Sequence, residues 1–248
     1  MITRAIFVLS SPEAAEQFLK VVPDLRAGGL SEATILHIVS AKRGPAEPMP
    51  DLANWVRHFE AAVPRVELAL KRGDAVKWIY ELARVRDADV VVLSGIRNGA
   101  EWDFESVSSP LRRLGIPILF LPDQEYAGAL GDHVLLAVKS LDSFQEAVPG
   151  LQGWLGQSGI RAIRICRPRE LVSAAECAGV SLEVLRKEGD VAGIILQQAK
   201  EWGATLLTIL AKADPDSEAG DPVVKPLLEG ALWPVLIWPA QGKTQLTR

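Results

Sequence analysis

Three serines offer hydroxyl groups at the predicted start of a short helix. They are Ser106, Ser108 and Ser109, and they precede Pro110, a residue that the first turn of a helix tolerates. Serine side chains at such a place cap the free backbone N–H groups of the first turn, or they contact a bound phosphate. We interpret these serines as helix caps and keep phosphate contact as the alternative.

The patterns that mark common catalytic or metal centres do not occur in the sequence. A Gly-x-Ser-x-Gly nucleophile elbow is absent. Cys166 and Cys177 are eleven positions apart and do not form a Cys-x-x-Cys redox pair. The segment Gly242-Lys-Thr244 lacks the upstream glycine and the following helix of a P-loop. None of the three histidines has a second ligand at metal-binding spacing: His37, His58 and His133. We therefore expect no catalytic and no metal-binding residues.

An arginine interrupts one apolar segment of the second half of the chain. Arg164 lies between Ile163 and Ile165, in a predicted strand. A charged side chain in a buried strand is costly without a partner. Either this strand lies near an edge of its sheet, or Arg164 projects into a cleft at the strand ends. In the second case it would pair with a small anion or with a carboxylate of the other half.

Composition limits the classes of protein that the chain can belong to. The 248 residues are 48% hydrophobic and 23% charged, as in globular proteins. The formal net charge of −4 argues against a nucleic-acid-binding surface. No apolar run reaches the ~18 residues of a membrane helix, so we expect no membrane insertion. The start of the chain does not read as a secretion signal, and two cysteines suit a reduced, cytoplasmic protein.

Repeated segments divide the chain into two halves. Residues 4–11 match residues 133–140 at an offset of 129, and residues 33–39 match residues 161–167 at an offset of 128. Further matches at offsets of 116 or 117 begin at residues 68, 88 and 116. The prediction is a domain over 1–122, a linker over 123–132 and a second domain over 133–248.

Each half alternates short apolar runs with helical patterns. The predicted strands of the first half are 6–9, 34–39, 66–70, 90–93 and 116–121, and the clearest helices are 13–22, 52–62 and 74–86. The strands are continuously apolar, as strands buried on both faces are. Alternating strands and helices favour a parallel sheet with right-handed crossovers. The prediction is therefore an α/β protein with two five-stranded parallel layers.

The order of these motifs resembles the universal stress protein family in its tandem form. The segments that carry the resemblance are Gly73-Asp74, Ala88-Asp-Val-Val-Val-Leu-Ser-Gly95, Ser106-Val-Ser108 and Gly115-Ile-Pro-Ile-Leu-Phe-Leu-Pro122. The resemblance implies two doubly wound domains of strand order 3-2-1-4-5, related by a pseudo-twofold axis. It also implies that the last strands associate, so that Trp233 and Trp238, which flank the last strand, would form an interdomain or intersubunit surface.

Members of the family that bind ATP hold its phosphates with a glycine-rich loop after the fourth strand. Glycines let backbone N–H groups approach phosphate oxygens, and the next helix adds its positive end. The resemblance assigns nucleotide contact in the first half to these residues: Ser10, Ser11, Val39, Gly95, Arg97, Gly99, Ser106 and Ser108.

The sequence departs from that ATP-binding pattern in both halves. In the first, Gly99 is one position late, Glu105 takes the place of the last glycine, and a serine replaces the acidic residue that ends the first strand. In the second, residues 211–221 hold one glycine and four carboxylates, which repel a polyphosphate, and Lys139 replaces the acidic residue. We expect no bound cofactor, with ATP allowed in the first half only.

The sequence as a whole favours a stress-response protein that binds or regulates and does not catalyse. Its expected partners are a second copy of itself, joined through the last strands, and an unidentified protein or small ligand. One alternative is an ATP-binding switch with weak ATPase activity, built on the loop from Gly95 to Ser106. Another is a structural partner of a membrane transporter, a role that proteins of this family often have.

Overall fold

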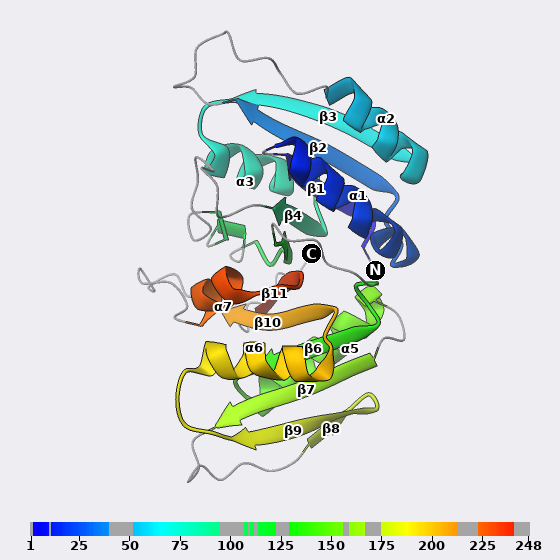
Figure 1. Ribbon diagram of the computed structural model, residues 1–248. Helices are drawn as coiled ribbons and strands as arrows, with labels where there is room; N and C mark the ends of the chain where they lie inside the picture. Colours follow the sequence, from blue (N-terminus) through cyan, green and yellow to red (C-terminus); the bar gives the residue numbers. More distant parts are fainter. Residues whose placement is uncertain are drawn as a thin grey trace.

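A computed structural model describes residues 2–9, 11–39, 52–94, 107–108, 110–111, 114–122, 129–155, 159–166, 175–212 and 223–240. Strands and helices alternate along the chain, and the strands build one continuous sheet (Figure 1). The α/β class predicted from the sequence is confirmed.

The first half follows the predicted order of strands and helices. It comprises β1 (Arg4–Leu9), α1 (Pro12–Ala27), β2 (Glu32–Val39), α2 (Leu52–Ala62), β3 (Arg65–Arg72), α3 (Ala75–Val85), β4 (Val90–Ser94) and β5 (Ile118–Leu121). Side chains fix two helix starts. The Ser11 hydroxyl accepts a hydrogen bond from the Ala14 N–H at 3.2 Å, and the Asp74 carboxylate accepts one from the Lys77 N–H at 3.2 Å.

The second half has the same order of five main strands. It comprises β6 (His133–Val138), α5 (Leu141–Leu155), β7 (Gly159–Cys166), β8 (Ala175–Cys177), β9 (Val180–Arg186), α6 (Val191–Trp202), β10 (Leu206–Lys212), α7 (Val224–Gly230) and β11 (Val235–Ala240). In its described residues, however, the short strand β8 lies where the first half has the helix α2, and a helix, α7, precedes its last strand. The short strand β8 pairs antiparallel with β9. Asp190 starts α6 by accepting hydrogen bonds from the N–H groups of Ala192 and Gly193, at 3.1 and 2.9 Å.

The sheet has eleven strands in the order β3-β2-β1-β4-β5-β11-β10-β6-β7-β9-β8. If the five main strands of each half are numbered from 1 to 5 along the chain, their order in the sheet is 3-2-1-4-5 in both halves. All neighbouring strands within each set of five are parallel. The halves join edge to edge, because β5 and β11 pair antiparallel. Figure 1 shows this junction in the middle of the molecule, with the halves stacked on either side of it.

The junction changes the expectation about self-association. β5 lies between β4 and β11, and β11 lies between β5 and β10, so both strands have hydrogen-bonded neighbours on each side. A homodimer through the last strands therefore cannot form by strand pairing, because the two last strands of one chain already occupy that edge. Trp238 lines a cavity together with residues of the first half, as predicted for a surface between the halves, whereas Trp233 packs on the helix layer of α3, α6 and α7.

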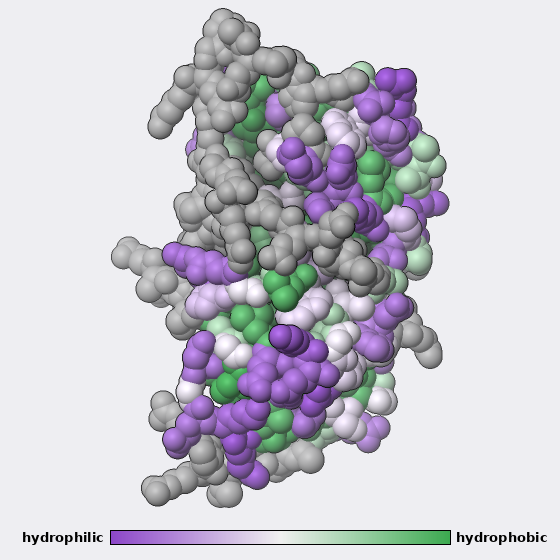
Figure 2. All heavy atoms as spheres, viewed as in Figure 1, coloured by the Kyte–Doolittle hydropathy of each residue, from purple (hydrophilic) through white to green (hydrophobic). Residues whose placement is uncertain are grey.

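Apolar side chains fill a layer on each face of the sheet. Alternate strand residues supply the two layers: Phe7 and Leu9 face α1, α2 and α5, whereas Ile6 and Val8 face α3, α6 and α7. On the view of Figure 2, hydrophilic residues cover α6, and hydrophobic residues show as small separate areas of the coloured surface. None of the helices in the described residues is long and apolar enough to cross a membrane.

The strand register corrects the alignment of the two halves by one residue. The sequence comparison aligned the second strands at an offset of 128. In the sheet, Leu9 lies beside His37, and Val138, the counterpart of Leu9, lies beside Arg164. The true offset is therefore 127, with His37 and Arg164 as counterparts. A slip of one residue exchanges the two faces of a strand, so this correction decides where Arg164 points.

Close contacts between α1 and α5 also hold the halves together. A Cβ atom at Gly28, which ends α1, would lie 2.6 Å from the carbonyl oxygen of Trp154 in α5, so only glycine permits this approach. Beside this contact, the Asp24 carboxylate accepts a hydrogen bond from the Leu130 N–H at 2.8 Å.

Candidate functional site

The carboxyl ends of the strands are the expected place for a ligand in a doubly wound sheet. Such sheets bind ligands where neighbouring crossovers leave to opposite faces. That point lies between β1 and β4 in the first half, and between β6 and β10 in the second.

Three of the eight predicted nucleotide contacts belong to the described residues. The other five lie outside them: Ser10, Gly95, Arg97, Gly99 and Ser106. The Ser11 hydroxyl caps α1. Val39 ends β2, and its carbonyl oxygen accepts a hydrogen bond from the Gly73 N–H at 3.0 Å. Ser108 is fully buried beside Val107 and Leu111, which belong to the apolar layer under α3. Val39 thus lies at the carboxyl edge, whereas Ser11 has a structural role.

Three residues at this edge of the first half were not predicted as site residues. Nδ1 of His37 lies 3.0 Å from the Leu9 carbonyl oxygen, at the end of β1. The Trp78 indole N–H donates to the Arg72 carbonyl oxygen at 3.0 Å, and the Lys71 ammonium lies 4.5 Å from the centre of the Trp78 ring. One sequence signal could have indicated Trp78 as a residue of this edge. It lies four residues after the cap Asp74 and therefore on the first turns of α3.

The corresponding edge of the second half carries a cleft of about 230 Å³. Its walls are mostly aliphatic, and Lys139, directly after the end of β6, also lines it. The aliphatic residues come from five elements: Ala137 and Val138 of β6, Ile163 and Ile165 of β7, Val191 and Ile195 of α6, Ile209 and Leu210 of β10, and Val223 and Val224 at the start of α7. This lining offers mostly apolar contacts to a ligand, with two cationic residues, Lys139 and Arg164, among them.

Arg164 borders this cleft but belongs to the opposite face of the sheet. Its neighbour Ile163 packs in the layer of α6, whereas Ala162 packs in the layer of α5. Alternation therefore places the Arg164 side chain on the α5 face. The first alternative given for this residue is wrong, because β7 lies inside the sheet, between β6 and β9. In the same strand, Arg161 donates two hydrogen bonds to Glu183, at 3.0 and 2.7 Å.

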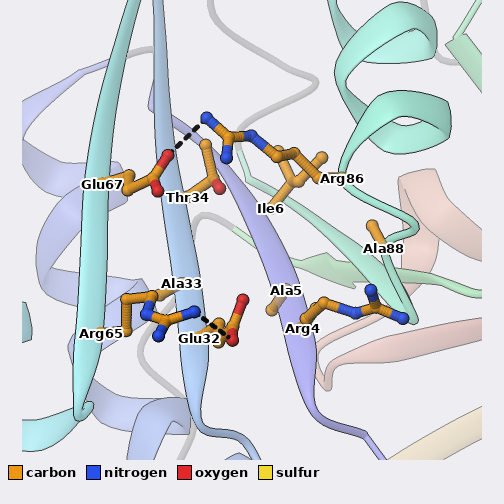
Figure 3. A pocket seen from close by; sticks show the side chains of 10 residues that line it. All are labelled: Arg4, Ala5, Ile6, Glu32, Ala33, Thr34, Arg65, Glu67, Arg86 and Ala88. Atoms are coloured by element: carbon orange, nitrogen blue, oxygen red, sulfur yellow. Dashed lines mark hydrogen bonds and ion pairs between the residues drawn. The ribbon is translucent and has the colours of Figure 1, made fainter.

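Charged side chains lie in a row across the amino ends of the first three strands, and opposite charges in this row form ion pairs. Arg65 pairs with Glu32 at 2.7 Å, and Arg86 pairs with Glu67 (Figure 3). Figure 3 shows the Arg4 side chain directed away from Glu32 and toward the segment of Ala88. The pocket between these side chains has a volume of about 30 Å³, room for a single water molecule and not for an organic ligand.

Metal ligation finds no support in the described residues. They contain no cluster of three or more histidine, cysteine, aspartate or glutamate side chains that could hold a metal ion. Cys177 is half-buried and lies 3.8 Å from the Gln145 carbonyl oxygen.

Comparison with known proteins adds to this geometry. No protein-family model matches the sequence, and no curated protein sequence matches it significantly. The structure, however, superimposes on a universal stress protein from Archaeoglobus fulgidus DSM 4304 with a TM-score of 0.69 over 95% of each chain, at 15% sequence identity. The chain has the universal stress protein fold. The resemblance found in the sequence motifs is thereby confirmed for the fold.

Two further solved structures have this universal stress protein fold along nearly the whole chain. One is a protein from Pseudomonas aeruginosa UCBPP-PA14 with a provisional assignment as a universal stress protein, which has a TM-score of 0.61 and 14% identity over 96% of this chain and 93% of its own. The other is the cytoplasmic domain of a prokaryotic cation chloride cotransporter, with a TM-score of 0.54 and 11% identity over 96% of this chain and 95% of its own.

Proposed function

We propose that the chain is a universal stress protein that acts by binding, as a regulatory protein of the stress response in the cytoplasm, and that it does not catalyse a reaction. The observation that carries the proposal is the second-half cleft, an aliphatic pocket at the position where this fold accepts ligands. Lys139 stands there in place of the acidic residue of ATP-binding relatives, and among the described lining residues only Lys139 and Arg164 are not aliphatic.

The loop sequences support the same proposal. A carboxylate near a phosphate is repulsive, and Glu105 replaces the last glycine of the ATP-binding pattern in the first half. Four carboxylates occur in the corresponding segment of the second half. Both halves would therefore have lost the phosphate-binding function while keeping the fold.

Titration with Mg–ATP tests the proposal. We expect neither heat of binding in calorimetry nor a thermal shift at millimolar ATP. Binding with micromolar affinity would contradict the proposal and favour the alternative, an ATP-binding switch that uses the loop from Gly95 to Ser106. In that case Gly99→Ala should weaken binding, whereas Gly153→Ala, in the outer turns of α5, should not.

Repair of the first-half pattern offers a second test. Glu105→Gly restores the glycine of ATP-binding relatives, and Glu105→Gln removes the charge alone. If the carboxylate is what blocks the phosphates, both variants should gain measurable affinity for Mg–ATP. If backbone approach is also needed, the glycine variant should gain more.

A second candidate function is that of a partner of a membrane transporter. The observation that favours it is the likeness to the cytoplasmic domain of a cation chloride cotransporter, which extends over both halves. Cross-linking in intact cells, followed by mass spectrometry of the linked peptides, tests this role. We expect links to the cytoplasmic face of one transporter. Links to soluble proteins alone would argue against it.

A further inference from the structure

The two outer edges of the eleven-stranded sheet differ in length and in cover. Figure 1 shows β3 at one end of the sheet and β8 at the other. β8 has three residues and covers β9, the third main strand of the second half, by antiparallel pairing. β3, the third main strand of the first half, has eight residues and pairs with β2 alone among the described strands. Within the described part of the chain, the same edge is thus covered in the second half and open in the first.

The backbone of β3 directs half of its polar groups toward this open edge. Arg65 and Gly73 donate their N–H groups to the carbonyl oxygens of Ser31 and Val39, at 3.1 and 3.0 Å, so the odd-numbered residues face β2. Successive residues of a strand direct their N–H and C=O groups to opposite sides. The outward-directed groups therefore belong to the even-numbered residues: Val66, Leu68, Leu70 and Arg72. Such a row is a template for a further strand.

Two exposed leucines follow the same edge. Leu68 and Leu70 are 38% and 49% exposed, although they lie on the face of the sheet where Val66 packs in the layer of α1 and α2. Glu67, Ala69 and Lys71 lie on the opposite face. An open edge that combines backbone donors with exposed apolar side chains is stabilised when another strand covers it.

The sequence of β3 is complementary to itself when two copies run antiparallel. If a twofold axis perpendicular to the sheet passes at Ala69, Glu67 lies opposite Lys71 of the second copy, and Leu68 lies opposite its Leu70. The symmetry repeats each pair, so two pairs of opposite charge and two apolar pairs form, and pairs of both kinds stabilise a sheet. The pairing is also compatible with the backbone, because the leucines carry the outward-directed groups.

The charges of β3 select this register over its neighbours. With the axis at Ala69, Arg65 faces Gly73 and Arg72 faces Val66, so no two cations of β3 lie opposite each other. An axis at Leu68 would place Arg65 opposite Lys71. An axis at Glu67 would place the two Glu67 side chains opposite each other, and an axis at Leu70 would pair no opposite charges. Like charges directly opposite destabilise a sheet.

The contacts that Glu67 and Lys71 make within one copy leave room for this pairing. The ion pair of Glu67 with Arg86 uses one carboxylate oxygen, Oε2, and Oε1 can face a second cation. The Lys71 ammonium lies on the Trp78 ring, 4.5 Å from its centre, and carries three N–H donors.

We propose that two copies of this chain associate through β3, so that one continuous antiparallel junction joins their sheets. The second copy takes at β3 the place that β8 takes at β9. Because both copies use the same strand, the contact closes as a twofold dimer and does not propagate into a fibre. The inference goes beyond the proposed function, because it uses neither the second-half cleft nor the loop from Gly95 to Ser106.

Sedimentation velocity of the full chain over a range of concentrations tests the inference. We expect a reversible change from the mass of one chain to the mass of two, and no larger species. A chain that stays monomeric up to millimolar concentration would overturn the inference, and so would a series of species larger than a dimer.

Two variants test whether the dimer uses β3. Leu68→Pro removes an outward-directed N–H from each copy and should weaken self-association at least about tenfold, whereas Leu68→Val keeps the N–H and should leave it unchanged. Lys71→Glu places a carboxylate opposite Glu67 and should weaken self-association about tenfold. Lys225→Glu, an exposed change in α7, is the control for charge and should have no effect.

Folding of each variant is checked by circular dichroism, and Lys71→Glu serves alone if Leu68→Pro does not fold. Adding Glu67→Lys to Lys71→Glu exchanges the two charges and should restore the dimer. A dimer that the folded β3 variants leave unchanged would overturn the inference, because it would use another surface.

A cross-link tests the register. Ala69 lies on the proposed axis in a pair without mutual hydrogen bonds, where the Cα atoms of opposite residues are about 4.5 Å apart and a disulfide can form. Ala69→Cys should therefore link two copies under mild oxidation, as non-reducing electrophoresis reports. The unaltered chain is the control, because its own cysteines, Cys166 and Cys177, belong to the second half. Linkage no greater than in this control would contradict the proposed pairing.

Discussion

Leu119 of β5 and Leu236 of β11 lie opposite each other at the one antiparallel junction between the halves. They are also each other's counterparts in the repeat, at an offset of 117. A residue that pairs with its own counterpart marks the position of a twofold axis, so the pseudo-twofold axis passes between these two leucines. Both side chains are fully buried, in the layer of α1 and α5.

Truncation of this central pair should destabilise the whole chain. We expect Leu119→Ala and Leu236→Ala each to lower the free energy of unfolding by about 2–5 kcal/mol, through lost apolar contact and the remaining cavity. Urea denaturation followed by circular dichroism measures the effect. Leu232→Ala is the control, with a change within about 0.5 kcal/mol, because Leu232 is 44% exposed.

The double variant of the two leucines tests whether they act on each other. Side chains in contact do not contribute additively, so the double variant should deviate from the sum of the single changes by about 0.5 kcal/mol or more. Simple additivity would contradict direct packing across the junction.

Two glycines of one helix should respond to alanine in opposite directions. Gly150→Ala places a methyl group 2.8 Å from the Trp238 ring and should lower the free energy of unfolding by about 1–3 kcal/mol. Gly153→Ala meets nothing within 4 Å and should raise it by up to about 1 kcal/mol, because alanine favours the helix. Thermal or urea unfolding measures both variants. Equal effects of the two substitutions would argue against the described packing of the Trp238 ring on Gly150.

Asp89 should make stability depend on pH in the acidic range. Burial raises its pKa, but the hydrogen bonds from Thr3 and from the Arg4 backbone outweigh burial and hold the pKa below its ordinary value. A carboxyl with a lowered folded pKa stabilises the fold above its unfolded pKa, and that stabilisation is lost as the pH falls through the folded pKa.

Asp89→Asn should therefore lower the free energy of unfolding near neutral pH by roughly 1–2 kcal/mol. The difference from the unaltered chain should shrink in strong acid. Urea denaturation near neutral pH and in strong acid measures this difference. Glu229→Gln is the control, because the Glu229 side chain is exposed. A difference that does not change with pH would contradict the assignment.

The two equivalent helix caps should differ in strength. Asp190 accepts hydrogen bonds from two backbone N–H groups of α6, whereas Asp74 accepts from one of α3. Replacement by alanine should lower the free energy of unfolding by about 1–2 kcal/mol for Asp190 and by about 0.5–1 kcal/mol for Asp74. A larger effect at Asp74 would show that the second hydrogen bond contributes nothing.

The order of strands and helices was predictable because apolar runs and cap residues are local signals. The predicted strand over residues 90–93 became β4, buried throughout, and the Gly73-Asp74 and Gly189-Asp190 pairs mark the starts of α3 and α6. The register of the second strands was not predictable to one residue. A strand buried on both faces has no alternation that distinguishes a face, so His37 and Arg164 could be matched only in the folded sheet.

The candidate sites depended on contacts that sequence spacing does not carry. The cavity at the junction brings together Arg4, Asp89, Trp154 and Trp238, from four distant parts of the chain. This cavity exists because β5 pairs antiparallel with β11 of the same chain. Pairing of β5 with the last strand of a second copy would satisfy the same backbone hydrogen bonds, so the sequence alone could not distinguish the two arrangements.

The shared ladder of β5 and β11 also limits how the chain can respond to a ligand. Two domains joined only by a linker can swing about a hinge and close over what they bind. Here hinge motion would break the backbone hydrogen bonds around Leu119 and Leu236 and expose their buried side chains. We therefore expect the halves to move as one unit, so that a response to a ligand would arise in the segments that border the ligand's own cleft.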